Sequence, residues 1–594
     1  MKRLIVLLLA IAVWIISNLS IGLLLGKYNY DLTKAQYYTL NKTSRDLAQN
    51  ISKPLIFRLY ISTNLSSYSL ESYRHAHYAT ALLSQYQSLN NKFINLEISR
   101  LKPYTAEAQL AEKNGIKAIP HNNEYAYFGL EVITDNQRKV ISELIPQRQS
   151  YFENDINRIL RNLQINQKPI IGIMSPEIPL FEKNQKQQIW SLIDEMKNNY
   201  KLMNVTQNAS YIPQTIKALV VLNPYILPQS SLYALEQYLL AGGKLIIFVD
   251  PYSEITQLYY GYPPHGKTSL GDILFNWGIR YNNDYVVGNM ETALQTTEGA
   301  DYPIWFMTSG NQYKKLSFHS AGSFSISPID GLDYQILITT PKNSGSVSTE
   351  YLRYFSKKDT VKHFQNNNKT YNLAIKVSGN FLSAHDENNT FNEQNNSPLP
   401  FLPIATEGAQ LIVIADSDFA SDEAWVLSSD EKNPIYGSAP YADNAEFILS
   451  LIDNSITDDN FPLANVYPKY FDETNITQAV STPLITAFQQ QKLDIEKQYH
   501  ETIEKLQDIE YQNINEDIDT GKRLQYKQQT EMLKNQINDY RNRLDRLNSL
   551  LIHRIELSVQ KIMLINAVIC PFIIILIFFL IINVLRKNNV KRLR

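Results

Sequence analysis

The residues best placed to do chemistry are carboxylates that follow two strongly apolar stretches. They are Asp250 in KLIIFVDP (244–251) and Asp416, Asp418, Asp422 and Glu423 in LIVIADSDFASDE (411–423). Acids that converge beyond the ends of parallel strands can bind a divalent cation or a polar ligand. If the two stretches form neighbouring strands, Asp250 and Asp416 share one crevice, and Asp418 follows two residues after Asp416. These three residues are therefore the candidate ligand-binding site.

The same acids also have a structural interpretation. Short carboxylates after a strand accept hydrogen bonds from free backbone N–H groups in Asx turns and helix N-caps. We favour this interpretation, and ligand binding stays the alternative. The sequence contains neither G-x-S-x-G nor H-E-x-x-H. We assign no catalytic residue and no metal ligand, and we expect no cofactor.

Residues 261–268, GYPPHGKT, match the G-x-x-x-x-G-K-[ST] pattern of a phosphate-binding loop. Such a loop must follow a core strand and open a helix. The nearest apolar strand ends at Asp250, and Pro263 and Pro264 have no N–H group to offer a phosphate. We interpret the match as a coincidence and do not expect this chain to be an ATPase.

Two glycines and two histidines have simple structural explanations. Gly242 and Gly243 precede a strand, so we expect them to end a helix and not to bind phosphate. His75 and His77 are two residues apart on a predicted helix and point to different faces, so they cannot easily share a metal. We expect both histidines at the surface.

Length, charge and cysteine content restrict the class of protein. The chain has 594 residues, too many for one core, and a net charge of -2 with acids and bases intermixed. This charge pattern gives no indication of nucleic-acid binding. The single cysteine, Cys570, lies in an apolar segment near the C-terminus, so disulfides and cysteine-based zinc sites are excluded from the rest.

Both ends of the chain are apolar enough to cross a bilayer. Residues 4–26 and 562–585 carry no charge, and each could form a helix of about 34–36 Å at about 1.5 Å per residue. A cleaved signal peptide is the alternative for the first segment, but its apolar stretch is too long and no A-x-A site follows. Basic residues flank the two segments on their outer sides, which predicts that both termini face the cytoplasm.

The region between these segments alternates apolar strands with helices, which predicts an α/β fold. A thioredoxin-like βαβ layer without the C-x-x-C pair comes first, and a doubly wound parallel sheet follows. Strands of the first layer are expected at 54–62, 92–103, 125–134 and 138–146, with a helix at 73–89. Strands of the second are expected at 168–176, 218–224, 242–251 and 409–419, with helices at 184–199, 229–240 and 443–453.

Two further segments differ in composition. Residues 363–403 are rich in asparagine and predict a surface loop. Apolar residues spaced along 482–560 predict a coiled-coil hairpin, through which the chain could form a homo-oligomer. The expected boundaries are an N-terminal anchor 1–26, a thioredoxin-like domain 27–165, an α/β domain 166–480, a hairpin 481–561, a transmembrane helix 562–585 and a basic cytoplasmic tail 586–594.

The order of several stretches carries a family resemblance. These stretches are DLTKAQYYTLNKTSRDLAQNISKPLIFRLYIS, YFGLEVI, KPIIGIMS, YLLAGGKLIIFVDP, LGDILFNWGIRYNNDYVVG, LAIKVSGNFLSAH and IVIADSDFASD, between two anchors. The chain resembles the auxiliary component of uncharacterised ABC-type transport systems, the group that includes the gliding-motility protein GldG. Its middle region is similar to a domain shared with an intraflagellar transport protein, which is a binding scaffold.

The resemblance implies a non-catalytic subunit that works with a separate ABC ATPase and a separate multi-span permease. In a bacterial cell, residues 27–561 would lie in the periplasm, held by the lipid bilayer of the inner membrane at both ends. Two alternatives remain open. One is a substrate-binding subunit whose domains clasp a small envelope ligand, and the other is an envelope hydrolase that uses Asp250 and Asp416.

Overall fold

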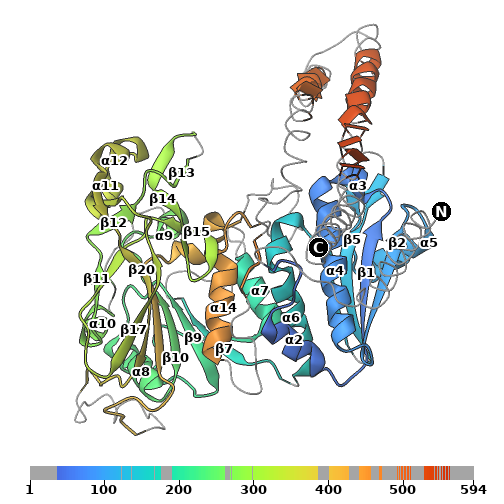
Figure 1. Ribbon diagram of the computed structural model, residues 1–594. Helices are drawn as coiled ribbons and strands as arrows, with labels where there is room; N and C mark the ends of the chain where they lie inside the picture. Colours follow the sequence, from blue (N-terminus) through green and yellow to red (C-terminus); the bar gives the residue numbers. More distant parts are fainter. Residues whose placement is uncertain are drawn as a thin grey trace, which may run out of the picture.

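The structure is a computed structural model. It describes residues 36–175, 190–260, 268–385, 400–426, 440–456 and 467–470, apart from positions 122, 123, 136, 166, 269, 297 and 298, together with helical stretches between 488 and 561. These residues form a mixed α/β structure with two main sheets, one at each side of Figure 1. The predicted α/β class is confirmed.

Among the described residues, no helix has both the length and the apolar character needed to cross a membrane. The expected membrane segments 4–26 and 562–585 lie outside the described residues, as do Cys570 and the basic tail 586–594.

The first sheet has the strand order β2-β1-β5-β6. Strand β1 pairs in parallel with β2 and antiparallel with β5, which pairs antiparallel with β6. The predicted βαβ unit and the strand pair after it are therefore confirmed. The elements of this region are α2 (Lys42–Gln49), β1 (Leu55–Ser62), α3 (Leu65–Tyr68), α4 (Leu70–Leu89), β2 (Ile94–Leu101), α5 (Ala106–Lys113), β3 (Ile119–His121), β4 (Glu124–Ala126), β5 (Phe128–Thr134) and β6 (Arg138–Ile141).

The prediction that both histidines of α4 lie at the surface is wrong for His75. Its side chain is 1% exposed, whereas His77 is exposed. The His75 ring packs edge-on against Phe128 and Phe152, with ring centres 5.2 and 5.6 Å away. Burial lowers the pKa of His75 to about 3, so its imidazole is a neutral core group at physiological pH.

The second sheet is mixed and not wholly parallel. Its order is β11-β16-β20-β21-β10-β9-β7-β8, with β17 paired to β20. The run from β8 to β21 is parallel, and β20, β16, β17 and β11 extend it with antiparallel pairs. The strands are β7 (Ile170–Met174), β8 (Lys201–Asn204), β9 (Ile216–Leu222), β10 (Lys244–Phe248), β11 (Ile279–Asn282), β16 (Ser323–Ile326), β17 (Leu332–Thr339), β20 (Asn372–Gly379) and β21 (Gln410–Ile414).

Helices cover both faces of this sheet because its strands are apolar on both sides. Helices α7 (Ser191–Asn199) and α14 (Asn444–Ile456) pack on one face, and α8 (Gln229–Leu240) and α10 (Gly271–Asn276) pack on the other. Gly242, with a φ of +84°, follows α8, and Gly243 donates its N–H to the Tyr238 carbonyl. The predicted helix end is confirmed.

Element η1 (Pro146–Tyr151) leads into α6 (Phe152–Gln164), which belongs to the core of the first sheet. Smaller elements surround the second sheet. They are α9 (Glu254–Tyr260), β12 (Tyr285–Gly288), β13 (Ala293–Gln295), β14 (Asp301–Gly310), β15 (Tyr313–His319), β18 (Ser344–Ser348), α11 (Thr349–Tyr354), α12 (Lys357–His363), β19 (Gln365–Lys369), η2 (Asp418–Ala420) and η3 (Asp422–Ala424). Strands β12, β18 and β19 form one small sheet, and β13, β14 and β15 form another.

The predicted asparagine-rich loop is shorter than 363–403. QNNNK (365–369) is strand β19, and residues 372–379 form β20 in the main sheet. The more asparagine-rich part, residues 386–399, lies outside the described residues.

GYPPHGKT does not have the setting of a phosphate-binding loop. Positions 261–267 lie outside the described residues, but helix α9 leads into them where a phosphate-binding loop needs a strand. The interpretation as a coincidence agrees with this order of elements.

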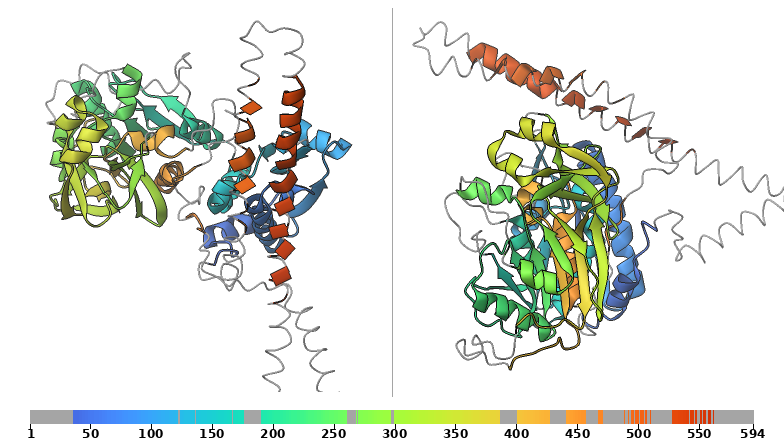
Figure 2. Two further views of the ribbon diagram at one scale, coloured as in Figure 1. Left: turned by 90° about the horizontal axis from the view of Figure 1, so that it is seen from above. Right: turned by 90° about the vertical axis from the view of Figure 1, so that its left-hand side faces the viewer.

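The described residues between 488 and 561 are helical. The Arg554 guanidinium lies 5.8 Å from the centre of the Phe488 ring, so the two ends of this region meet. Figure 2 shows the described stretches side by side, projecting from the body of the molecule. Ile537 and Leu551 are buried there. Supercoiling of the two stretches stays a prediction.

Candidate functional site

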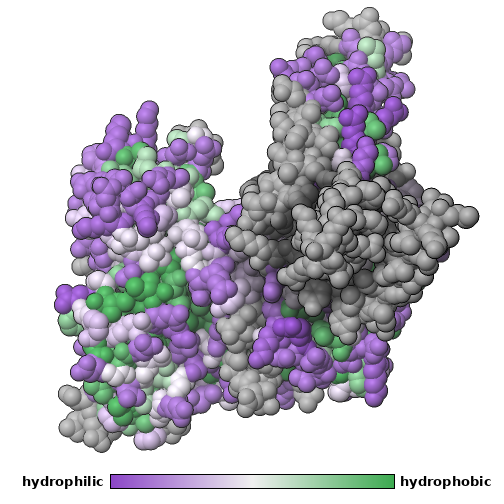
Figure 3. All heavy atoms as spheres, viewed as in Figure 1, coloured by the Kyte–Doolittle hydropathy of each residue, from purple (hydrophilic) through white to green (hydrophobic). Residues whose placement is uncertain are grey.

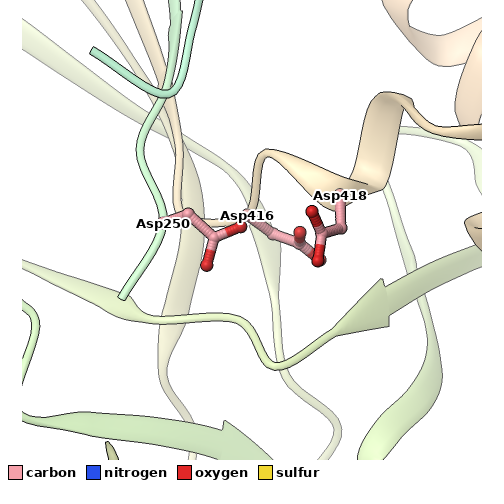
Figure 4. A group of neighbouring side chains, drawn as sticks. All are labelled: Asp250, Asp416 and Asp418. Atoms are coloured by element: carbon pink, nitrogen blue, oxygen red, sulfur yellow. The ribbon is translucent and has the colours of Figure 1, made fainter. Parts of the chain in front are cut away.

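Strands β10 and β21 bring the candidate aspartates together. The two strands are parallel neighbours, and Phe248 is paired with Ile414. Asp250 and Asp416 each follow two residues later, so they leave the sheet at the same edge. Asp418 lies at the start of the 3-10 helix η2. Figure 4 shows the three carboxylates close together, and one oxygen from each lies within 4.8 Å of the others. The predicted convergence is confirmed.

Backbone and hydroxyl groups hold Asp250 in place. Its Oδ2 accepts hydrogen bonds from the Ser417 N–H at 2.9 Å and the Ser417 hydroxyl at 2.8 Å. Its Oδ1 accepts from the Tyr252 N–H at 2.8 Å, which forms an Asx turn just after the strand. Asp250 thus ties the end of β10 to the segment that follows β21.

Asp416 and Asp418 have similar partners. Asp416 accepts from the N–H groups of His319 and Phe419, at 2.8 and 3.0 Å. Asp418 accepts from the Ser253 hydroxyl at 2.8 Å and from the Glu254 N–H, which begins α9. Asp418 therefore acts as a helix cap supplied from a distant part of the chain. These contacts are what the structural interpretation requires.

The three aspartate side chains are also buried next to one another. Asp250, Asp416 and Asp418 are 4%, 0% and 1% exposed. No lysine, arginine or histidine of the described residues makes an ion pair with them. Burial raises the pKa of Asp250 to about 7. Burial, reinforced by the charge of Asp250, raises the pKa values of Asp416 and Asp418 well above their ordinary range.

A cluster of this kind must retain protons or gain a positive partner at neutral pH, because unpaired buried charge is costly. Its donors are carboxylate oxygens, which suit a hard cation such as Ca²⁺ or Mg²⁺. Each oxygen that accepts one hydrogen bond keeps a second lone pair. The three residues could therefore hold a cation in addition to capping the backbone. The ligand role of Asp250, Asp416 and Asp418 stays a prediction.

The remaining predicted acids do not join this cluster. Asp422 accepts hydrogen bonds from the N–H and the hydroxyl of Ser191, at 2.9 and 3.0 Å, and so caps helix α7. Burial raises its pKa to about 6. Glu423 lies beside it in η3. For Asp422 the structural interpretation is confirmed.

The site contains residues that were not predicted from the sequence. Ser253, Ser417 and the backbone of His319 contact the aspartates directly. Tyr281 on β11 brings into the same region a buried hydroxyl that has no hydrogen-bond partner among the described residues. Ser417 could have been predicted as part of the site because it lies between Asp416 and Asp418 in the sequence. His319 could not, because it is 97 residues from Asp416.

The His319 side chain is an unsuitable general base. Its ring stacks on Trp305, with ring centres 5.0 Å apart, and its Nε2 lies 3.3 Å from the Ser317 hydroxyl. Burial, with a smaller effect from Lys357, lowers its pKa to about 3. The imidazole is neutral at physiological pH and gains little by taking a proton.

A second buried polar cluster lies where α6 meets α14, between the two main sheets (Figure 1). Arg158 donates to Glu446 at 2.7 and 2.8 Å and to Asp453 at 3.3 Å. Arg161 donates to Asp453 at 2.6 Å. All four side chains are at most 7% exposed. We call Arg158, Arg161, Glu446 and Asp453 the ionic junction.

Neighbouring groups complete the contact around the ionic junction. Tyr200 donates to Asp453 at 2.7 Å, and Asn154 donates to Glu446 at 2.7 Å. A small hollow beside it is lined in part by Arg148, Tyr151 and Trp425. The contact between the sheets is thus crowded and ion-bridged.

Comparison with known proteins supports a transport family. Residues 168–450 match the family described as an ABC-type uncharacterized transport system, and residues 34–132 match a domain of unknown function. The first match confirms the resemblance to an auxiliary component of an ABC-type system. It does not test the narrower resemblance to the gliding-motility protein. No curated protein matches.

One solved structure with a detectable likeness is the exo-β-1,4-mannosidase Op5Man5 from Opitutaceae bacterium strain TAV5. It is 10% identical, with a TM-score of 0.19, and the alignment covers 59% of this chain and 45% of the mannosidase. The chain thus spans less than half the length of that protein. A likeness at this level says nothing about activity.

Proposed function

Because residues 168–450 match an ABC-type transport family, we propose that this chain is a non-catalytic auxiliary subunit of an ABC transporter. A separate ATPase and a separate multi-span permease would be its partners. The family match is the observation that carries the proposal.

The proposed location is the inner membrane of a bacterium. Residues 4–26 and 562–585 would cross the bilayer, with both termini in the cytoplasm and residues 27–561 in the periplasm. The support is the length of the two uncharged segments and the basic residues on their outer sides. A periplasmic position also leaves GYPPHGKT without access to cytoplasmic ATP.

The proposed role is to couple the transporter to another component of the envelope. The thioredoxin-like layer and the doubly wound domain would move as one body, because the ionic junction fixes α6 against α14. The coiled-coil hairpin would connect this body to the second membrane helix, and it could also join two copies of the chain. Movement of the permease could then reach the periplasmic body through the hairpin.

The crowded contact between the sheets bears on the substrate-binding alternative. A subunit that clasps a small ligand needs an open cleft between its domains, whereas the ionic junction fills this contact with paired charges. A ligand entering there would have to separate these charges. We therefore place this alternative behind the auxiliary role.

The convergence of Asp250, Asp416 and Asp418 keeps the envelope hydrolase as a second candidate, because a cation held by three carboxylates could activate water. The burial of all three acids counts against this reaction, since a polymer of the cell envelope could not reach them. The hydrolase alternative requires an opening above β10 and β21.

Purification of the tagged full-length chain in a mild detergent tests the proposal. Mass spectrometry of the co-purified proteins should find an ABC ATPase and a multi-span permease, each enriched over a purification of an unrelated two-anchor membrane protein with the same tag. Recovery of the chain with envelope hydrolases or sugar polymers, and without ATPase, would contradict it.

A further inference from the structure

Helices α11 and α12 form one end of the molecule, beside β12 (Figure 1). Leu352, Val361 and Phe364 point inward and pack in a small core with Tyr252 and Val286. These inward side chains are sufficient to hold two short helices against the sheet. The outward side chains are not part of this core.

Several outward side chains at this end are aromatic. Tyr354 is 78% exposed, Phe355 is 51% exposed, and Tyr285 on the adjacent strand β12 is 48% exposed. The Tyr351 ring stacks on His363 at 4.1 Å and lies 5.2 Å from Phe355, which links α11 to α12 and fixes the outer rings. Large exposed apolar groups that lie together mark contact surfaces.

The same segment is basic although the chain is not. Residues 349–369 contain five Lys or Arg and two Asp or Glu, whereas the whole chain has a net charge of -2. Lys357 and Lys362 are paired with Glu254 and Asp359. Lys358 is exposed and has no carboxylate partner among the described residues. Figure 3 shows hydrophilic and hydrophobic side chains mixed at this end.

We propose that this basic aromatic end, carried by Tyr285, Tyr354, Phe355, Lys357 and Lys358, rests on an anionic lipid bilayer. Aromatic rings with a polar edge favour the depth of the lipid headgroups. Lysine and arginine side chains beside them are attracted to anionic lipids.

The composition favours a bilayer over a protein partner. Protein interfaces are depleted in lysine, particularly at their centre. Here the Lys357 ammonium lies over the half-buried Trp305 ring, with its Nζ 3.6 Å from the ring centre, and Lys358 beside it in the sequence is exposed. Lysines interleaved with rings are typical of surfaces that bind membranes.

Photo-crosslinking of the full-length chain tests this inference directly. The chain carries benzoylphenylalanine in place of Tyr354 and is reconstituted into vesicles of phosphatidylcholine with or without phosphatidylglycerol. The control carries the same crosslinker in place of Leu110, which is 59% exposed on α5 at the other side of the molecule. We expect lipid adducts at position 354 at least about tenfold above those at position 110, and only with the anionic lipid.

A charge variant separates electrostatic attraction from tethering by other parts of the chain. Lys358→Glu should lower the adduct yield at position 354 at least about fivefold, and added salt should act in the same direction. Lys217→Glu makes the same change at an exposed lysine of β9 and should have no effect. Circular dichroism checks that both variants fold.

Three results would overturn the proposal. They are equal lipid adducts at positions 354 and 110, adducts that do not depend on anionic lipid, and, in native membranes, adducts to a protein in place of lipid. The last result would identify the basic aromatic end as a protein-docking surface. None of these results depends on whether the chain serves a transporter.

Discussion

Replacing Asp453 with asparagine tests whether the ionic junction holds the two sheets together. Asp453 is 3% exposed and accepts hydrogen bonds from Arg161, Arg158 and Tyr200. Asparagine has nearly the same size, so no cavity forms, but the charge is lost. Removing one partner from a buried ion pair costs about 3–5 kcal/mol, because the remaining charge keeps its desolvation penalty.

Hydrogen exchange measures this loss within the full-length chain. A loss of about 3 kcal/mol increases the opening of α14 by a factor of about 150, since about 1.4 kcal/mol corresponds to tenfold. We expect its slowest amides to exchange at least about 100-fold faster in Asp453→Asn. The control is Asp194→Asn, which breaks an exposed pair with Lys197 and should cost less than about 1 kcal/mol.

The pH dependence of the ionic junction has a defined sign. Burial opposes the charge on Asp453, but Arg161 and Arg158 outweigh it and lower the pKa of this carboxyl below its ordinary value. The stabilisation is therefore complete above about pH 4 and is lost as the pH falls through the lowered pKa. If Asp453→Asn and Asp194→Asn exchange alike at neutral pH, the two sheets are not joined by these charges.

Three further perturbations test other parts of the structure. The pKa of Asp250 is raised to about 7, so the folded state holds an extra proton between about pH 4 and pH 7, and the free energy of unfolding should fall as the pH rises through this interval. Thermal melts in the presence of a chelator should show this fall in the native chain and a smaller one in Asp250→Asn. A stability that rises with pH over this interval contradicts the account. Gly242→Ala places a Cβ on a backbone with a φ of +84°, 2.9 Å from the Glu407 carbonyl oxygen, so the free energy of unfolding should fall by at least about 1 kcal/mol. The control is Gly271→Ala, whose Cβ would have nothing within 4 Å and which should leave the free energy of unfolding unchanged or raise it. Ile537→Asp places a charge at a buried position of the hairpin and should reduce the amount of ATPase and permease that co-purifies with the chain. Met532→Asp, at a 63% exposed position, should not. Equal co-purification with both variants would show that the hairpin is not needed for partner binding.

The sequence contained enough information to predict the candidate site because its key contacts follow from strand order. Apolar runs rich in β-branched residues, such as KLIIF and LIVI, are typical of buried strands of a parallel sheet, and parallel strands end at the same edge. Asp250 and Asp416 were therefore predictable neighbours. The caps made by Asp418 and Asp422 were predictable as a type, but their partners in α9 and α7 were not.

Other features depend on contacts that local patterns do not encode. Residues 365–369, QNNNK, have low strand propensity, yet they pair with β18 at the edge of a small sheet. His75 is polar in sequence but fits among aromatic rings in the core. Arg158 and Glu446 are 288 residues apart, so the ionic junction becomes visible only in the folded chain.

The most direct measurement of the central claim is the molar ratio of proteins in a mild-detergent purification of the full-length chain from its own membranes. The account predicts one ABC ATPase and one multi-span permease, each in an amount comparable to that of the chain. Recovery of the chain without either protein, under conditions that keep other ABC transporters intact, would contradict the assignment as a transporter subunit.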